Sequence, residues 1–453
     1  MLIDTHCHLE WNSYDADRDA VVRRAEQNDV RRLLTIGTNL PDARKTLAIV
    51  QTYPNVYGAF GIHPHDSQTA DAAVYAELKA MAGRPKIVAY GEIGLDFFKN
   101  YSPREAQLAA FAAQVRLARE LDLPIIIHDR EAHEATLAIL RAEGGSYRGV
   151  FHCFAGDEKM AEEVLALGFH LSFTGSITYE NKSKAHRIIR EMPFERLMLE
   201  TDSPFLTPVP HRRERNEPAY VRLVADQVAA IRQEPVDEVI RQTTLNAYQL
   251  FKFENQGRRP EIAYEYKGAL YLNLTSRCTN RCSFCAKFPA FTLDGHYLAL
   301  ERREEPTVAE VLDAIREPAK YPEIVFCGFG EPTLRWNDLI QIAKALKSRG
   351  ARRIRLNTNG HADLINKRAV APEMKGAIDA VSVSLNAPDA AAYRELCRPA
   401  FGERTFSAVV EFIRRAKQFV PEVVASVVEV PGLNVAAARR LAEESLGVPL
   451  RVR

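Results

Sequence analysis

Two kinds of hydrophobic pattern alternate along the first half of the chain. Short runs rich in Val, Ile, Leu and Phe are separated by longer stretches, such as residues 71–83 and 104–122, whose apolar positions recur at helical spacing. Eight strand-like runs occur in order, at residues 1–6, 31–37, 56–63, 87–94, 124–129, 149–154, 169–175 and 197–202. Strands that alternate with helices predict a parallel sheet, and eight such units over about 250 residues predict a closed (β/α)8 TIM barrel. The last helix is expected over residues 236–253.

The same rhythm starts again in the second half. Residues 254–265 are polar, contain Gly and Pro and show no periodicity, so we expect a linker there. Six further strand-like runs follow, at residues 269–275, 323–330, 353–360, 380–387, 423–430 and 449–453. Six units are too few to close an eight-stranded barrel. The sequence therefore predicts an α/β chain with a closed barrel over 1–253 and a partial, open (β/α)6 barrel over 266–453.

Composition and charge limit the classes of function. The 453 residues carry a formal net charge of +1, so no overall basic field recruits nucleic acid, and any polyanion must bind at a local site. Seven cysteines, unevenly placed, favour a reducing compartment over a disulfide framework. A basic segment followed by an apolar run is missing at the N-terminus, as is any apolar run of about 18 residues. We therefore expect a cytoplasmic protein with no membrane partner.

Imidazoles and carboxylates stand at the ends of many strands of the first half. In a parallel barrel these ends meet at one mouth, where active sites lie. Neutral imidazole and carboxylate oxygen suit Zn²⁺, Mg²⁺ or Mn²⁺, and there are more such groups than one ion needs beside an open water position. Any one of these histidines alone is better explained as a core or surface residue, so the hypothesis of a two-metal site depends on their convergence. The residues are His6, His8, His63, Glu92, His128, His152, Glu200 and Asp202.

Spacing suggests individual roles within this set. His6 and His8 are two positions apart and so share one face of an extended segment. Glu92 is expected to bridge two metal ions, and Asp202 to hold one ion and accept a proton from the attacking water. Cys7 and Cys153, which are neighbours of these ligands, are expected to pack rather than to ligate.

The first half closely resembles a known family. The segments LIDTHCHL, GIHPHD, GEIGLDF, IIIHDR, FHCFAG, LETDSPFL and RNEPAYV follow one another as they do in TatD metal-dependent deoxyribonucleases. The resemblance covers residues 1–253 and implies a metal-dependent hydrolase barrel that cleaves phosphodiesters, commonly as an exonuclease on DNA. It implies metal ligation by His6, His8, Glu92, His128, His152 and Asp202, and contact with the substrate, such as phosphate binding, by His63.

A loop rich in arginine follows the eighth predicted strand. Residues 211–218, HRRERNEP, contain three arginines that could contact phosphate, although a solvated loop explains them equally well. Pro218 is expected in the first turn of the next helix, where proline is favoured.

Three cysteines are concentrated just after the first strand of the second half. Cys278, Cys282 and Cys285 have the spacing C-x₃-C-x₂-C. A structural zinc would need a fourth ligand, and neither Cys nor His follows within the next ten residues. Three thiolates can instead hold three irons of a 4Fe–4S cluster and leave the fourth open for chemistry.

The second half resembles the radical S-adenosylmethionine (SAM) superfamily. CTNRCSFC, with Phe284 before the last cysteine, matches the cluster motif, and GFGEP, LNTNG and VSLNA match later strand motifs. The resemblance covers residues 266–453 and implies a 4Fe–4S cluster, SAM, and a cellular reductant such as flavodoxin or ferredoxin. The residues that it assigns to cluster or SAM are Cys278, Cys282, Cys285, Phe284, Gly328, Gly330, Glu331, Asn357, Asn359 and Ser384.

The leading hypothesis is a bifunctional enzyme, similar to proteins described as TatD-associated radical SAM proteins, that acts on DNA or a nucleotide. One alternative keeps the barrel but makes the second half an iron–sulfur redox sensor, against which the GEP and TNG motifs argue. Another gives the barrel a small ester, amide or lactone as substrate.

Overall fold

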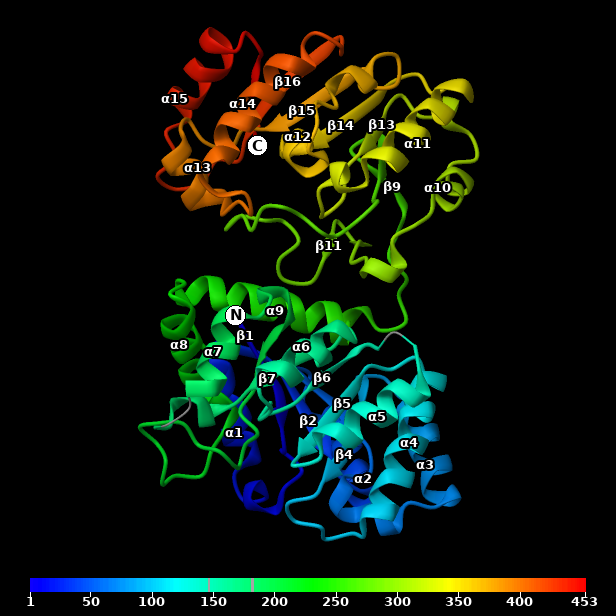
Figure 1. Cartoon of the computed structure of the whole chain (residues 1–453), viewed down its shortest axis with the longest axis vertical. Helices are drawn as coiled ribbons and strands as arrows, with labels where there is room; N and C mark the ends of the chain where they lie inside the picture. The colour runs from blue at the N-terminus through cyan, green and yellow to red at the C-terminus, as the bar shows by residue number, and fades with distance from the viewer. Residues whose placement is uncertain (146, 181–182) are drawn as a thin grey trace. The chain divides into compact units, whose positions relative to one another are not determined.

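The computed structural model describes residues 1–145, 147–180 and 183–453, and it divides the chain into two compact units. The first unit spans Met1–Gly257 and the second spans Arg258–Arg453. Figure 1 shows each unit as a sheet covered by helices.

The first unit is built on eight parallel strands that pair in chain order, β1 to β8. A parallel bridge between Cys7 and Ser203, and the Asp202 N–H donating to the His6 carbonyl oxygen at 2.9 Å, link the last strand back to the first. The predicted (β/α)8 barrel is therefore confirmed. The strands are β1 (Leu2–Cys7), β2 (Val30–Gly37), β3 (Val56–Phe60), β4 (Ile87–Asp96), β5 (Ile125–Arg130), β6 (Gly149–Phe151), β7 (His170–Phe173) and β8 (Leu197–Leu199).

Helices cover the outside of this barrel. Several begin at a capping side chain; Asn39, Asp71 and Asp157 each accept a hydrogen bond from a backbone N–H in the first turn. The last helix packs against both β1 and β8, where the barrel closes. The helices are α1 (Arg18–Gln27), α2 (Leu40–Thr52), α3 (Ala72–Ala82), α4 (Arg104–Glu120), α5 (His133–Glu143), α6 (Glu158–Ala166), α7 (Ser183–Glu191), α8 (Val221–Arg232) and α9 (Val236–Phe251).

Burial along whole strands is what makes the barrel interior a packed core. Every residue of β1, β3 and β4 is buried, because one face lies under helices and the other lines the interior. Gly94 on β4 has φ +144°, and a Cβ there would lie 1.9 Å from the carbonyl oxygen of His128. Only glycine permits so close an approach of β4 to β5. That approach places Glu92 and His128 on neighbouring strands at the same end of the barrel.

The second unit is an open sheet with strand order β17-β16-β15-β14-β13-β10-β9. Six of its strands are parallel, which confirms the partial (β/α)6 barrel, and β9 pairs antiparallel with β10 at the edge. β9 was not predicted; it begins at Ala263, inside the segment expected to be a linker. The strands are β9 (Ala263–Tyr266), β10 (Ala269–Leu272), β13 (Ile324–Phe326), β14 (Ile354–Thr358), β15 (Ala380–Ser384), β16 (Glu422–Val427) and β17 (Leu450–Val452), with a separate hairpin of β11 (Thr292–Leu293) and β12 (His296–Tyr297).

The outer face of this sheet packs under helices, and the inner face stays partly open. On β14, Ile354, Leu356 and Thr358 are buried, whereas Arg355 and Asn357 between them are partly exposed. The helices are α10 (Val308–Ala314), α11 (Trp336–Ser348), α12 (Ala362–Asn366), α13 (Ala390–Cys397), α14 (Thr405–Ala416) and α15 (Val435–Arg440).

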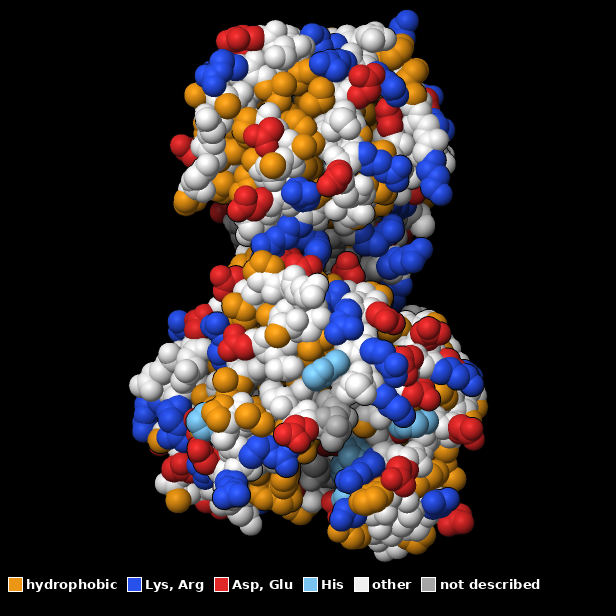
Figure 2. All heavy atoms as spheres, turned by 60° about the vertical axis from the view of Figure 1, so that its left-hand side comes forward, with side chains coloured by type: hydrophobic (Ala, Val, Ile, Leu, Met, Phe, Trp, Pro, Cys, Tyr) orange, Lys and Arg blue, Asp and Glu red, His pale blue; other side chains and the backbone are white. Residues whose placement is uncertain are grey.

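The surface of each unit carries charges of both signs. Figure 2 shows basic and acidic side chains interspersed over the visible face, in keeping with the formal net charge of +1. Among the described residues, no helix has the length and apolar character needed to cross a bilayer.

Candidate metal centre and cysteine loop

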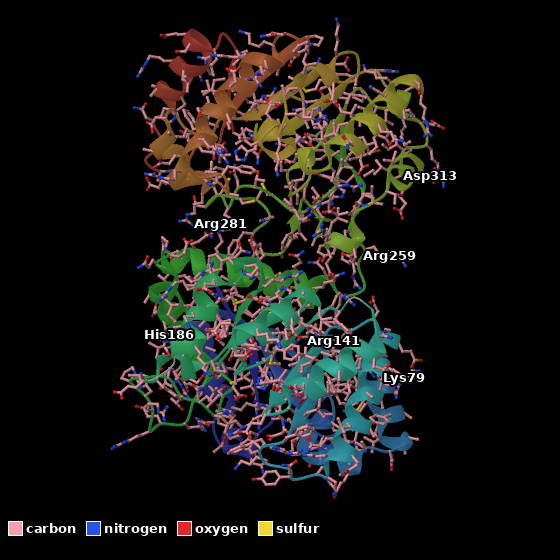
Figure 3. The ribbon with its side chains drawn as sticks, viewed as in Figure 1. Lys79, Arg141, His186, Arg259, Arg281 and Asp313 are labelled. Carbon is pink, nitrogen blue, oxygen red and sulfur yellow. The ribbon has the colours of Figure 1, made fainter. Side chains whose placement is uncertain are left out.

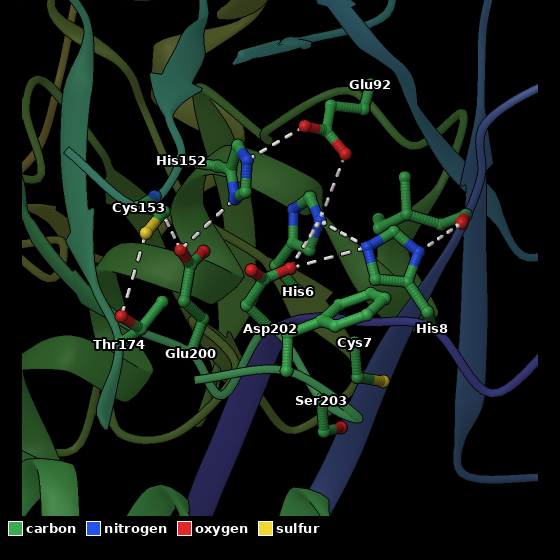
Figure 4. Close-up of polar contacts among 12 residues, drawn as sticks. His6, Cys7, His8, Glu92, His152, Cys153, Thr174, Glu200, Asp202 and Ser203 are labelled. Carbon is green, nitrogen blue, oxygen red and sulfur yellow. Dashed lines mark hydrogen bonds and ion pairs between the residues drawn. The ribbon is translucent and has the colours of Figure 1, made fainter. Parts of the chain in front are cut away.

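The imidazoles and carboxylates at the strand ends of the first unit converge at the barrel mouth (Figure 4). His6 lies near the end of β1 and His8 directly follows it, and their Nε2 atoms are 3.3 Å apart. Glu92 Oε1 lies 2.6 Å from His128 Nδ1 and 2.8 Å from His152 Nε2. Asp202, which follows β8, brings its Oδ1 to 3.4 Å from His8 Nε2. Residues from five strands therefore share one small volume.

Within this volume three triads have ligand atoms that all lie within 4.8 Å of one another. Two of them share Glu92 and two share His6, so neighbouring ion positions would have ligands in common. The atoms that face one another in this volume are imidazole nitrogens and carboxylate oxygens, such as His6 Nε2 and Glu92 Oε2 at 3.4 Å, and these are donors that suit divalent ions. The residues present therefore fit a pair of divalent ions. The triads are His6–His152–Asp202, His6–His8–Glu92 and His63–Glu92–His128.

Charge balance in this buried cluster keeps its central carboxylate ionised. Burial raises the pKa of Glu92, but the nearby imidazoles of His152 and His63 outweigh it and hold the pKa well below its usual range. Burial lowers the pKa of His8, but Glu10 and Asp202 outweigh it and raise the pKa well above the usual value. A cation at this position would replace the protons that the imidazoles otherwise carry.

A second set of carboxylates orients the histidines from behind. Glu10 Oε1 lies 3.0 Å from His8 Nδ1, and Asp96 Oδ2 lies 3.4 Å from His128 Nε2. Glu200 Oε1 lies 3.4 Å from His152 Nδ1. Such partners fix the ring and tautomer of a histidine that binds metal. Sequence reasoning had left Glu10 and Asp96 out and had given Glu200 no role; the alternation His8-x-Glu10 was the available signal.

His63 lies between the ligand cluster and the loop that follows β3. Its Nε2 is 3.5 Å from Glu92 Oε1, and its Nδ1 accepts a hydrogen bond from the backbone N–H of His65. Burial lowers the pKa of His63 to about 4, so the ring is neutral near pH 7. His63 also belongs to one of the three triads, His63–Glu92–His128. Its contact with substrate, expected from the sequence, stays a prediction.

Exposed aromatic rings surround the mouth. Trp11 is 42% exposed and Phe205 is 44% exposed, and their rings meet edge to face with centroids 5.3 Å apart. Both rings also lie within 6.4 Å of the His8 ring. Tyr101 is 65% exposed, and its ring lies 4.7 Å from that of His65. Rings in this position could stack on planar groups of a substrate.

The arginine loop that follows β8 is largely engaged within the first unit. Arg215 forms a bidentate ion pair with Asp17, and the guanidinium of Arg212 stacks 3.5 Å from the centroid of Tyr179. Arg213 is exposed. Pro218 opens a short 3₁₀ turn, Pro218–Tyr220, that leads directly into α8.

Cys278, Cys282 and Cys285 lie on a loop after β10; Figure 3 labels Arg281 on this loop. The loop is fastened to the end of α13 by the Arg281 N–H donating to the Cys397 carbonyl at 2.9 Å and the Ser283 N–H donating to the Leu396 carbonyl at 3.1 Å. Backbone N–H of Asn280 and side-chain Nδ2 of Asn359 point at the Cys278 sulfur, at 3.4 and 3.8 Å. Donors of this kind accompany the sulfurs of iron–sulfur sites.

The thiols are not gathered as one tetrahedral ion would require. Zn–S bonds of 2.3 Å put two sulfurs about 3.8 Å apart. Among the described residues, the groups whose ligand atoms lie within 4.8 Å of one another do not include Cys278, Cys282 and Cys285. A larger cluster with one thiolate on each of three irons fits this loop better than a single zinc ion.

The GFGEP segment after β13 packs directly under the cysteine loop. A Cβ on Gly330 would lie 2.3 Å from the Thr275 carbonyl oxygen and 2.4 Å from that of Arg277, and a Cβ on Gly328 would lie 2.2 Å from Asn273 Oδ1. These glycines therefore serve the contact between strand and loop, whatever ligand lies above them.

Glu331 joins the ends of β13 and β14. Its buried carboxylate accepts hydrogen bonds from the hydroxyls of Thr333 and Thr358, each at 2.7 Å, and from the Asn359 N–H at 2.6 Å. The Glu331 side chain therefore braces the two strand ends, and the role in SAM binding expected for the backbone of this motif stays a prediction. Its position still fixes Asn359 beside the cysteine loop.

The remaining residues assigned to the cofactor lie at different depths. Asn359 reaches the cysteine loop, where its Nδ2 also donates to Thr279 Oγ1 at 2.9 Å. Phe284 packs against the core of the second unit. Asn357 and Ser384 lie on the open inner face of the sheet, where Ser384 Oγ accepts a hydrogen bond from Arg453 Nη2 at 3.2 Å.

Comparison with known proteins agrees with this division. The model of the family described as TatD related DNase matches residues 3–252, and that of the Radical SAM superfamily matches residues 272–444. Both halves are thus enzyme domains, the first a metal-dependent hydrolase and the second a radical SAM domain. The chain belongs to the TatD related DNase family.

Individual relatives match the first half along almost their full length. An uncharacterized metal-dependent hydrolase, YabD of Bacillus subtilis, is 40% identical over 253 residues, which is 56% of this chain and 99% of YabD. The 3'-5' ssDNA/RNA exonuclease TatD of Erwinia amylovora is 38% identical over 257 residues, 55% of this chain and 99% of that protein. The crystal structure of YjjV, a TatD homologue from Escherichia coli, superposes with a TM-score of 0.53 at 32% identity and covers 55% of this chain and 98% of its own.

Proposed function

We propose that the first unit is an exonuclease that cleaves single-stranded DNA with two divalent ions. The observation that carries this proposal is the set of three overlapping triads, two of which contain Glu92 and two of which contain His6. The exposed aromatic rings at the mouth support a single-stranded substrate, because unpaired bases can stack on them. The name of the Erwinia relative, an exonuclease on single-stranded DNA and RNA, points in the same direction.

Each residue has a role in this proposal. His6, His8, Glu92, His128, His152 and Asp202 would hold Zn²⁺, Mg²⁺ or Mn²⁺, with Glu92 between the two ions. Two such ions activate a water molecule and stabilise the charge on the phosphate oxygens. Asp202 Oδ1 would accept the proton of the attacking water, and the neutral His63 would donate a hydrogen bond to a phosphate oxygen.

Nuclease assays with the purified chain test the first proposal. We expect shortening of a 5'- or 3'-labelled single-stranded oligonucleotide that depends on added metal, is abolished by EDTA and is lost in Asp202→Asn. Asp226→Asn is a matched control, because Asp226 lies exposed on α8, paired with Arg222. Hydrolysis of small esters or amides without action on DNA would contradict the proposal and favour a small-molecule hydrolase.

We propose that the second unit binds a 4Fe–4S cluster through Cys278, Cys282 and Cys285 and cleaves SAM reductively. The fit of the cysteine loop supports this, since two N–H donors point at the Cys278 sulfur and both edges of the loop are fastened by backbone hydrogen bonds. With SAM and an electron from a reductant such as flavodoxin or ferredoxin, such a cluster supplies a 5'-deoxyadenosyl radical. Phe284 would shield the cluster loop, and Asn359 would hold Cys278 in place.

Anaerobic reconstitution tests the second proposal. We expect about four irons per chain and formation of 5'-deoxyadenosine from SAM with dithionite, both lost in Cys282→Ala. Cys397→Ala is the control, because Cys397 is the buried last residue of α13 and lies outside the motif. A cluster that forms without any turnover of SAM would contradict the proposal and favour a redox sensor.

A further inference from the structure

The inner face of the second sheet carries an excess of positive charge that no part of the proposed chemistry uses. Strand register places Arg355 beside Val325, Ser384 beside Ser426, and Ser426 beside Arg451. Paired residues of parallel strands point to the same face, so Arg453, two residues after Arg451, points there too.

Hydrogen bonds fix the last of these arginines over the face. Arg453 Nη2 donates to Ser426 Oγ at 2.8 Å and to Ser384 Oγ at 3.2 Å, both neutral acceptors. Among the described residues, its guanidinium forms no ion pair with a carboxylate. It interacts electrostatically with Cys327, just after β13, and with Arg355 on β14, so these side chains lie on the same side of the sheet.

An unpaired hydrogen-bond donor points to a missing ligand at the same place. Among the described residues, the Nε–H of Arg355 is buried without a hydrogen-bond partner, and an oxyanion could accept from it. Nη2 of Arg355 pairs with Glu323 at 2.8 Å, and Arg353 pairs with both Glu323 and Glu422, so these two arginines are balanced by two carboxylates. Among the described residues, the positive charge of this face that has no carboxylate partner therefore lies at Arg453, and an anion bound beside it would balance that charge.

We propose that the inner face of the second unit binds an oxyanion, either a phosphate or a carboxylate, of the substrate of the radical reaction. Arg453 and Arg355 would hold the anion, and the hydroxyls of Ser384 and Ser426 would complete the hydrogen-bonding shell. Arginine suits this role because its planar fork matches both kinds of oxyanion. The proposal rests on the radical SAM function of this unit.

Labelling of Cys327 gives a local test, because this thiol lies partly exposed on the same face and tryptic peptide 321–335 contains no other cysteine. In the reconstituted full chain, we expect inorganic phosphate or succinate to slow alkylation of Cys327 by N-ethylmaleimide at least threefold. Arg453→Gln should lose this protection. Arg439→Gln should keep it, because Arg439, on α15, already pairs with Glu443. The more protective of the two probes identifies the oxyanion.

Calorimetry checks the same prediction without the thiol: Arg453→Gln should lose one oxyanion site that Arg439→Gln keeps. Lack of protection by both probes, or protection that survives in Arg453→Gln, would overturn the proposal.

Equilibrium dialysis separates the substrate from SAM. We expect the parent chain and Arg453→Gln to bind SAM equally. Loss of SAM binding in Arg453→Gln would mean that the anion is the carboxylate of SAM, and the assignment to the substrate would be wrong. Failure to form 5'-deoxyadenosine would reject the radical SAM function and leave the oxyanion result standing.

Discussion

Oε1 of Glu92 lies 2.8 Å from Nε2 of His152. The other oxygen of the same carboxylate, Oε2, lies 3.4 Å from Nε2 of His6. One carboxylate thus faces ligands from β1 and from the end of β6, which is the arrangement that a group bridging two ions needs.

Glu92→Gln should therefore remove both ions from their shared position. We expect the loss of nuclease activity to exceed the 10–100-fold that removal of an outer partner costs, since a direct ligand is lost. Metal content by elemental analysis and activity on a labelled oligonucleotide measure the effect. Glu77→Gln is the control, because Glu77, on α3, pairs with Arg44 at the surface and lies outside the metal centre. Retention of both ions at full occupancy would contradict the bridging role.

Glu200→Gln tests the outer shell. Its carboxylate accepts hydrogen bonds from the Cys153 N–H and from Ser172 Oγ, both at 2.6 Å, and lies behind His152. Glutamine keeps the shape but loses the charge that holds the imidazole in one orientation. We expect metal affinity to fall by about 10–100-fold, as for other outer-shell partners, with little change in thermal midpoint. Competition with a chelator measures the affinity, and an unchanged value would assign Glu200 to packing alone.

The sequence predicted the two folds and the convergence of ligands because both follow from local pattern and one topological rule. Strand ends of a parallel barrel meet, so histidines at those ends must meet as well. The outer carboxylates were missed because their role depends on distance: Asp96 is 32 positions from His128 in the chain and 3.4 Å from it in space. β9 was missed because its four residues, AYEY, are too short to show a pattern beside a polar segment. The packing of Gly328 and Gly330 against protein carbonyls and an amide was also missed, because it depends on the distance between strand and loop; their assignment to SAM stays a prediction.

The exposed rings of Trp11 and Phe205 should affect the binding of polymer substrates and not the rate of the chemical step. Trp11 and Phe205 are each more than 40% exposed, so truncation to Ala leaves the core intact. Base stacking on such a ring is worth about 1–3 kcal/mol, so KM for single-stranded DNA should rise by about 5–150-fold in the double variant. Hydrolysis of a small chromogenic phosphodiester should be unchanged. Equal losses on both substrates would show that the rings support the metal centre instead.

Gly330→Ala should displace the cysteine loop. The added methyl carbon would lie 2.3 Å from one backbone oxygen and 2.4 Å from another, and backbone atoms of a fastened loop move at a cost. We expect iron incorporation after reconstitution to fall to less than half that of the parent chain, while metal-dependent nuclease activity stays the same. Gly83→Ala controls for the substitution, because nothing lies within 4 Å of a Cβ there. Normal iron content in Gly330→Ala would show that the loop tolerates the shift.

His170 gives a prediction for stability against pH. It lies at the start of β7, at the opposite end of the strand from the metal centre, and is 7% exposed with Nδ1 donating to the Gly149 carbonyl at 3.3 Å. Burial, followed by the nearby charge of Arg196, lowers the pKa of His170 from 6.5 to about 3. Between pH 6.5 and pH 3, His170 is therefore protonated in the unfolded chain and neutral in the folded chain.

The contribution of His170 to stability is therefore present above pH 6.5 and is lost as pH falls toward 3. Between pH 6.5 and 4.5 this loss should lower the free energy of unfolding of the first unit by up to about 2–3 kcal/mol. His170→Gln should remove this part of the acid sensitivity. Pulse-labelling hydrogen exchange of β7 peptides across a urea series measures the transition of this unit at each pH. His211→Gln serves as the control, because His211 is partly exposed and paired with Glu214 at 3.0 Å. Equal acid sensitivity in His170→Gln and the parent chain would show that His170 is protonated in the folded barrel.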